Sequence, residues 1–102
     1  MILLDSNILI YSAKPEAIQV WEFLSDNDLS ISAISLVEVL GYRNLNADDE
    51  AYLKEFIQSC QVLDIRRVEI DLAIDLRHQR KMSLGDSIIA ATASSYTFPG
   101  KR

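Results

Sequence analysis

The sequence predicts an α/β domain in which helices cover a central parallel sheet. Its first apolar run, Ile2–Leu4, has the pattern of a strand buried on both faces, which is typical of the middle of a parallel sheet. The run stops at a polar cluster beginning with Asp5, and open α/β sheets bind ligands at the carboxyl ends of such strands. Strand and helix patterns then alternate, as in sheets with right-handed crossovers. A chain of 102 residues can bury one core, so residues 1–102 are expected to form a single domain.

The first half of the chain is predicted to add two helices and a second strand. Pro15–Ser25 has a helical pattern, with a proline at its first position and an apolar face. Leu29–Ile34 alternates apolar and small polar residues, which indicates a strand. Ser35–Tyr42 is predicted to be a short helix, with Ser35 as its N-cap and Glu38 as the capping-box partner.

The second half is predicted to hold three helices and a third strand. Ala51–Cys60 carries apolar residues on one helical face, and Gln61–Ile65 follows as a strand. Val68–Arg80 has the pattern of a longer helix with cations near its end, where they complement the helix dipole. Ser83–Ser95 is rich in small and apolar residues, as expected of a helix packed closely on a sheet. Residues 93–102 include an atypical tail in which no strand is predicted.

Composition excludes several classes of protein. A net charge of −5 argues against a nonspecific nucleic-acid binder that relies on a positive field, but not against a nuclease whose metal ions add positive charge. Cys60 is the only cysteine and His78 the only histidine, so neither a disulfide framework nor a Cys/His zinc site can form. No apolar run approaches the roughly 20 residues of a membrane span, and the start lacks a signal-peptide pattern. A reducing, cytoplasmic location is expected.

Three acidic residues, Asp5, Glu38 and Asp86, are candidates for a shared site. Each also has a purely structural explanation: Asp5 can cap the segment after the strand, and Ser35-x-x-Glu38 and Ser83-x-x-Asp86 both match the capping box. The two functions are compatible, because a helix N-terminus favours the ionised carboxylate that binds a hard cation. Three carboxylates from distant segments suffice for magnesium, which keeps several of its waters. Spacing alone leaves both interpretations open.

Three segments resemble the motifs of the PIN domain, specifically the VapC-like toxins. LLDSNILIY resembles the opening strand and polar turn of that family, ISLVEVLGY its second acidic motif, and LGDSIIAATA its third. The resemblance implies a three-layer α/β/α fold and a Mg²⁺- or Mn²⁺-dependent endoribonuclease, the toxin of a type II toxin–antitoxin system held inactive by its antitoxin. It also implies that Asp5, Glu38 and Asp86 are the catalytic residues and metal ligands, with Ser6 and Asn7 as polar groups near the site.

The C-terminal end departs from the family pattern. Family members continue past the third motif into another strand, a turn bearing a fourth acidic residue, and a last strand. This sequence ends in SSYTFPGKR, which contains no Asp or Glu, so the last strands of the family fold are expected to be missing. The Ile2–Leu4 strand would then lie at a sheet edge, and we expect a homodimer or a strand-swapped oligomer.

Two other functions remain open from the sequence. The first is a catalytically inactive, truncated PIN-like protein that retains only antitoxin binding or self-association. The second is a 5′ nuclease-like enzyme acting on DNA. Six cations could contact RNA phosphates, although solvated helix faces explain them equally well: Arg43, Arg66, Arg67, Arg77, Arg80 and Lys81. Lys81 is the best RNA-binding candidate because it closely precedes the third acidic motif.

Overall fold

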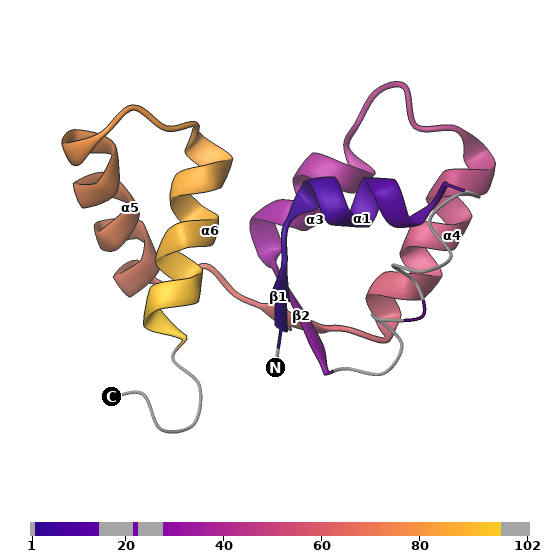
Figure 1. Cartoon of the computed structure of the whole chain (residues 1–102), viewed down its shortest axis with the longest axis horizontal. Helices are drawn as coiled ribbons and strands as arrows, with labels where there is room; N and C mark the ends of the chain where they lie inside the picture. The colour runs from indigo at the N-terminus through magenta and orange to yellow at the C-terminus, as the bar shows by residue number, and fades with distance from the viewer. Residues whose placement is uncertain (1, 15–21, 23–27, 97–102) are drawn as a thin grey trace.

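The computed structural model of the chain describes residues 2–14, 22 and 28–96. The helix predicted over Pro15–Ser25 falls, except for residue 22, outside the described residues. Within them the chain forms a three-stranded sheet flanked by helices, which confirms the predicted α/β class and its three-layer arrangement (Figure 1). None of the described helices is long and apolar enough to cross a membrane.

The sheet consists of β1 (Ile2–Leu4), β2 (Leu29–Ser32) and β3 (Gln61–Leu63), which are parallel and ordered β1-β2-β3. In the register, Leu3 lies opposite Ser30 and Ser30 lies opposite Gln61. All three predicted strands are present, and the second and third are shorter than predicted.

One expectation for β1 was wrong. It is not buried on both faces in the middle of the sheet: β1 pairs with β2 alone among the described strands, and only Leu4 is buried while Ile2 and Leu3 are partly exposed. Among the described strands, β1 lies at the edge of the sheet, beside β2.

The helix that follows β1 was not predicted. Helix α1 (Ser6–Ser12) begins at once after the strand, with Asp5 as its N-cap and Leu9 fully buried. The run Ile8–Tyr11 is apolar at every position, so it shows no helical period, and three of its residues are in fact exposed. The Asp5 cap was the one local signal for this helix.

The next two helices begin earlier than predicted. Helix α3 (Ala33–Leu40) is capped by Ser32, whose Oγ accepts from the Ile34 N–H at 3.2 Å, so the prediction of Ser35 as N-cap was wrong. Ser35 is instead fully buried inside the first turn. Helix α4 (Ala47–Gln58) is capped by Asn46, and three acidic residues occupy its first turn, where the helix dipole favours negative charge.

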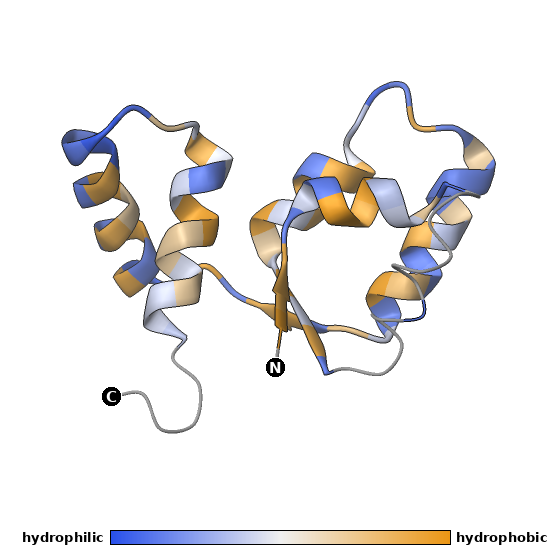
Figure 2. Ribbon diagram, viewed as in Figure 1, coloured by the Kyte–Doolittle hydropathy of each residue, from blue (hydrophilic) through white to orange (hydrophobic). Residues whose placement is uncertain are grey.

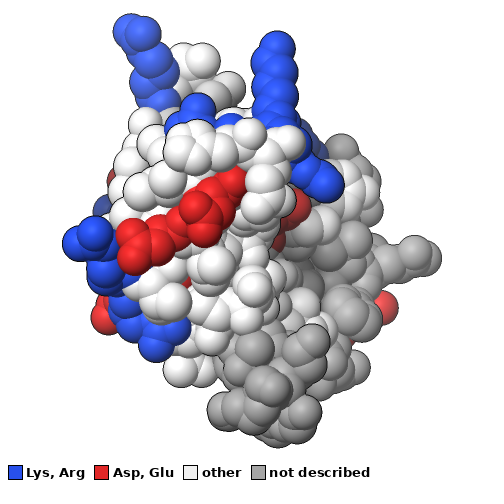
Figure 3. All heavy atoms as spheres, turned by 90° about the vertical axis from the view of Figure 1, so that its left-hand side faces the viewer, with Lys and Arg blue, Asp and Glu red and all other residues white. Residues whose placement is uncertain are grey.

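The last two helices, α5 (Arg67–Gln79) and α6 (Leu84–Ser95), match their predictions to within one residue at each end. They pack against each other on one side of the sheet, and α6 also contacts α3 and β2 (Figure 1). The outer surface of this pair carries a band of acidic side chains with basic side chains above and beside it (Figure 3).

The hydrophobic core lies between the sheet and the helices of the N-terminal part (Figure 2). It is formed by residues from β1, β2, α1, α3 and α4: Leu4, Leu9, Leu29, Ile31, Val39, Leu53 and Ile57. This core fixes the carboxyl ends of β1 and β2, where the polar segments begin.

Candidate active site

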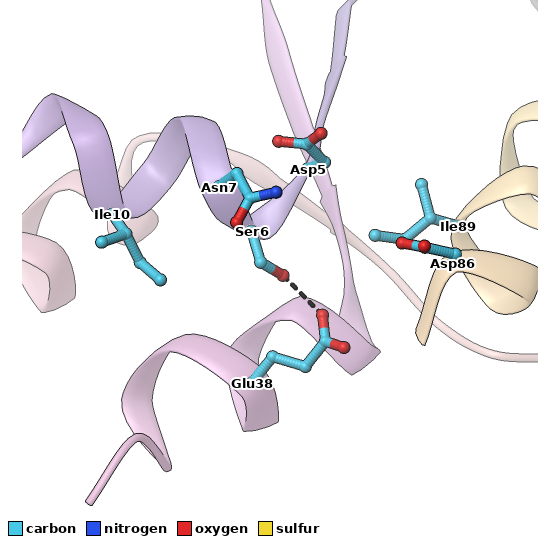
Figure 4. Close-up of a pocket in the computed structure, with 7 residues that line it drawn as sticks. All are labelled: Asp5, Ser6, Asn7, Ile10, Glu38, Asp86 and Ile89. Atoms are coloured by element: carbon cyan, nitrogen blue, oxygen red, sulfur yellow. Dashed lines mark hydrogen bonds between the residues drawn. The ribbon is translucent and has the colours of Figure 1, made fainter. Parts of the chain in front are cut away.

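A pocket of about 240 Å³ opens where β1 ends, between the first turns of α1 and α6 and the second turn of α3 (Figure 4). It brings together the three acidic residues singled out in the sequence. Its lining consists of Asp5, Ser6, Asn7, Ile10, Glu38, Asp86 and Ile89. The candidate catalytic residues and both near-site polar residues are therefore in one place, at the carboxyl edge of the sheet.

Asp5 serves the fold and the pocket at once. It follows the last residue of β1, and its Oδ1 accepts a hydrogen bond of 2.9 Å from the Ile8 N–H, which caps α1. The structural explanation of Asp5 is thus correct. It is compatible with a further role, because the cap engages one carboxylate oxygen and the exposed carboxylate still lines the pocket.

Glu38 does not cap α3, contrary to the capping box that the sequence predicted. With Ser32 as the N-cap, Glu38 lies in the second turn of α3, too far along the helix to cap it. Its Oε1 instead accepts a hydrogen bond of 2.5 Å from Ser6 Oγ, which joins the start of α1 to α3 (Figure 4). Ser6 is therefore a positioning residue for the second carboxylate.

Asp86 lies in the first turn of α6, as predicted. Its backbone N–H donates to Ser83 Oγ at 3.0 Å, which is the expected N-cap hydrogen bond. Its exposed side chain extends from α6 toward Asp5 across the pocket (Figure 4). Of the three carboxylates, it alone is carried by the α5–α6 pair.

Gly85 packs against Glu38 and was not singled out in the sequence. It is buried, and a Cβ atom at this position would clash with Glu38 Oε2 and lie 2.9 Å from Glu38 Cδ. The Glu38 carboxylate therefore lies directly against the backbone of α6, which only a glycine permits. The signal was present as the glycine of the Leu84-Gly85-Asp86 sequence, but its partner lies 47 positions earlier.

The chemistry of this donor set suits a hard divalent cation. The three acidic side chains offer carboxylate oxygens, all three are exposed, and no Lys or Arg is among the lining residues. Among residues 2–14, 22 and 28–96, however, no three Asp, Glu, His or Cys side chains stand close enough together to hold an ion. The fold thus gathers the carboxylates in one pocket, and rotation of these exposed side chains would be needed to direct them at a common point.

Two of the predicted RNA-contacting cations have structural roles. Arg66 donates from its Nη2 to Glu69 Oε2 at 2.6 Å, and its guanidinium carbon lies 3.9 Å from the centre of the Tyr96 ring. Glu69 is fully buried and also accepts from Ser95 Oγ. Hydrogen bonding from Arg66 lowers the pKa of Glu69 from the ordinary 4.5 to about 2. Arg67 pairs with Asp71 at 3.0 Å.

Comparisons with known proteins agree on the fold. A family model described as the PIN domain matches residues 2–99. A solved structure described as a toxin–antitoxin complex from Klebsiella pneumoniae is similar, with a TM-score of 0.73 and 29% sequence identity. That match covers 94% of this chain and 80% of the other. A search among curated proteins gave no match.

Proposed function

This chain belongs to the PIN domain family, and from that premise we propose that it is a metal-dependent endoribonuclease, the VapC-like toxin of a toxin–antitoxin pair. PIN domains are generally nucleases. The observation that carries the proposal is the pocket at the end of β1, where Asp5, Glu38 and Asp86 from three distant segments line one cavity. An open, acid-lined pocket suits a polymeric substrate better than a small molecule, which is usually enclosed.

In this proposal Asp5, Glu38 and Asp86 hold one Mg²⁺ or Mn²⁺ ion. When bound, the metal would supply an activated water and neutralise charge on the phosphodiester. The chain's own contribution is to hold the three carboxylates in place: Asp5 by its cap on α1, Glu38 by Ser6 and Gly85, and Asp86 by the start of α6. Asn7, which lines the same pocket, is proposed to donate to a phosphate oxygen or a water.

We further propose an antitoxin as the regulatory partner, because the similar solved structure is a toxin–antitoxin complex. The free thiol of Cys60 suits the reducing cytoplasm in which such a pair would act. We retain residues 1–102 as a single domain and propose that it self-associates through the open edge of β1. A mass that stays that of a monomer at every concentration in light scattering would refute the self-association.

A second candidate function is a catalytically inactive PIN-like protein that only binds an antitoxin or another copy of itself. It is favoured by the carboxylates' failure to converge within the described residues. The two candidates differ in one measurable property, which is metal-dependent cleavage.

The deciding experiment measures RNA cleavage by the 102-residue chain with Mg²⁺, with Mn²⁺ and with chelator. We expect cleavage when Mg²⁺ or Mn²⁺ is present and none in chelator. Asp86→Asn should abolish cleavage while leaving the circular dichroism spectrum unchanged. Asp75→Asn removes an exposed carboxylate on α5 outside the pocket, so it serves as the matched control and should retain full activity.

Metal binding should be measured separately from activity. Mn²⁺ should raise the melting temperature of the native chain, since a ligand that binds only the folded state stabilises it, and Asp5→Asn should remove the increase. No cleavage across a broad RNA panel by a folded, Mn²⁺-binding chain would favour the inactive candidate. Equal cleavage of matched DNA oligonucleotides would point to the DNA-directed enzyme.

A further inference from the structure

Of the eight Lys and Arg residues that the structure describes, three form ion pairs and five form none. Lys54, Arg66 and Arg67 each pair with an acidic residue three or four positions along the same helix, at 2.6 to 3.1 Å. Within the part of the chain that the structure describes, five exposed cations make no ion pair: Lys14, Arg43, Arg77, Arg80 and Lys81. The last three lie within five positions of one another in the sequence. We call Arg77, Arg80 and Lys81 the basic turn.

The basic turn precedes the segment that carries Asp86. Helix α5 ends at Gln79, and α6 begins at Leu84, with Asp86 in its first turn, so the turn is the segment that leads into the third carboxylate. The α5–α6 connection and the start of α6 lie at the same end of the molecule as the end of β1 (Figure 1). Basic side chains stand out from this end when the molecule is viewed from the α5 side (Figure 3).

Complementing the helix dipole does not account for this cluster. The C-terminus of a helix carries about half a negative elementary charge, which falls off within the last turn. Arg77 alone among the three lies in that last turn, whereas Arg80 is already extended, with φ −155° and ψ 160°. Three unpaired positive charges lie within five positions of one another in the sequence and repel one another, in a chain whose net charge is −5. An external anion would relieve that repulsion.

We propose that the basic turn binds backbone phosphates of the RNA strand beside the position where it is cut. The carboxylate pocket by itself repels a polyanion, so a strand that crosses it needs attractive contacts next to it. Cations that contact phosphates supply such attraction without reading the base sequence, and they fix the register of the strand. The inference rests on the proposed function for RNA as the substrate, while the cation cluster and its exposure are independent of it.

The test measures binding of a labelled single-stranded RNA by fluorescence anisotropy in chelator, where no cutting occurs. The variant Arg77→Gln/Arg80→Gln/Lys81→Gln should bind about tenfold more weakly or worse, and the slope of log K against log salt should fall by about 2. Arg67→Gln is the matched control, because it removes an exposed but ion-paired cation at the other end of α5, and it should bind like the native chain. Arg77→Lys/Arg80→Lys should keep most of the affinity, since phosphate contact requires charge.

Each result decides the inference separately from the proposed function. Unchanged affinity and salt slope in the triple Gln variant would overturn the inference, even if Asp86→Asn abolishes cleavage and so supports the nuclease. No RNA binding by the native chain in chelator would overturn it as well. If the native chain binds RNA but never cleaves it, and the triple variant binds RNA more weakly, the inference is supported while the proposed nuclease function fails.

Discussion

The two parts of the molecule that form the pocket are stabilised differently. The sheet with α1, α3 and α4 encloses a continuous apolar core, to which no residue of α5 or α6 belongs. The α5–α6 pair buries mostly small or polar groups: Ala73, Ala91, Gly85, Ser87, Thr92 and Glu69. It also leaves large apolar residues exposed: Val68, Ile70, Ile74 and Leu84.

This difference bears directly on the site. Asp5 and Glu38 are carried by elements of the apolar core, whereas Asp86 is carried by the α5–α6 pair. The position of α6 depends on its close approach to α3 at Gly85 and, at its other end, on the contacts of the buried Glu69 with Arg66 and Ser95. Such contacts are short and directional, so a small change there should move one carboxylate without unfolding the core.

The largest effect should come from removing core volume. Leu9→Ala is expected to lower the free energy of unfolding by about 2–5 kcal/mol, because the fully buried side chain leaves a cavity. Ile74→Ala on α5 should change it by no more than about 0.5 kcal/mol, since that side chain is 48% exposed. Urea denaturation of the two variants measures both values. Similar losses would show that the two parts are not stabilised differently.

Acid should weaken the α5–α6 pair through Glu69. Its pKa is held at about 2 in the folded chain against an ordinary 4.5, so its ionised form contributes in full above about pH 4.5 and the contribution is lost as the pH falls toward 2. At about 1.4 kcal/mol per pKa unit, the loss is at most about 3–4 kcal/mol. Stability measured by denaturation across this pH range gives the curve.

Glu69→Gln serves as the control for that pH dependence. The variant should be less stable than the native chain at neutral pH and should show a flatter curve below pH 4.5, because the titrating group is gone. An identical acid loss in the variant would mean that other carboxylates cause it.

A small effect on stability, with a clear effect on activity, is expected at Gly85. Gly85→Ala places a methyl group where Glu38 Oε2 lies, and the end of that exposed, flexible side chain can move away cheaply. Stability should therefore change by less than about 1 kcal/mol, since alanine also favours the helix. Cleavage should fall about 10- to 100-fold because a carboxylate is displaced. Parallel melting and cleavage assays, with the exposed Ser94→Ala as control, separate the two effects.

Interactions local in the chain were predictable from the sequence. Ser83 caps α6 through Asp86, which lies three residues on, and the extents of α5 and α6 follow from nearby caps and apolar spacing. The fold class follows from the alternation of strand and helix patterns, and the three carboxylates were found through motifs that each span a few residues. Hydrogen bonds between close neighbours depend on little besides the local sequence.

Two kinds of feature were decided only by the tertiary structure. One is the choice between equivalent local signals, and the other is every contact between distant segments. Ser32 and Ser35 are both acceptable N-caps for α3, and Ser32 is the cap because β2 ends at that residue. The exposure of β1 on one side depends on its neighbours in the sheet rather than on its own apolar sequence. The same holds for Glu38, which Ser6 and Gly85 position from other elements. Such contacts form only once the sheet and the helices have packed, because no local pattern encodes which distant side chain will be adjacent.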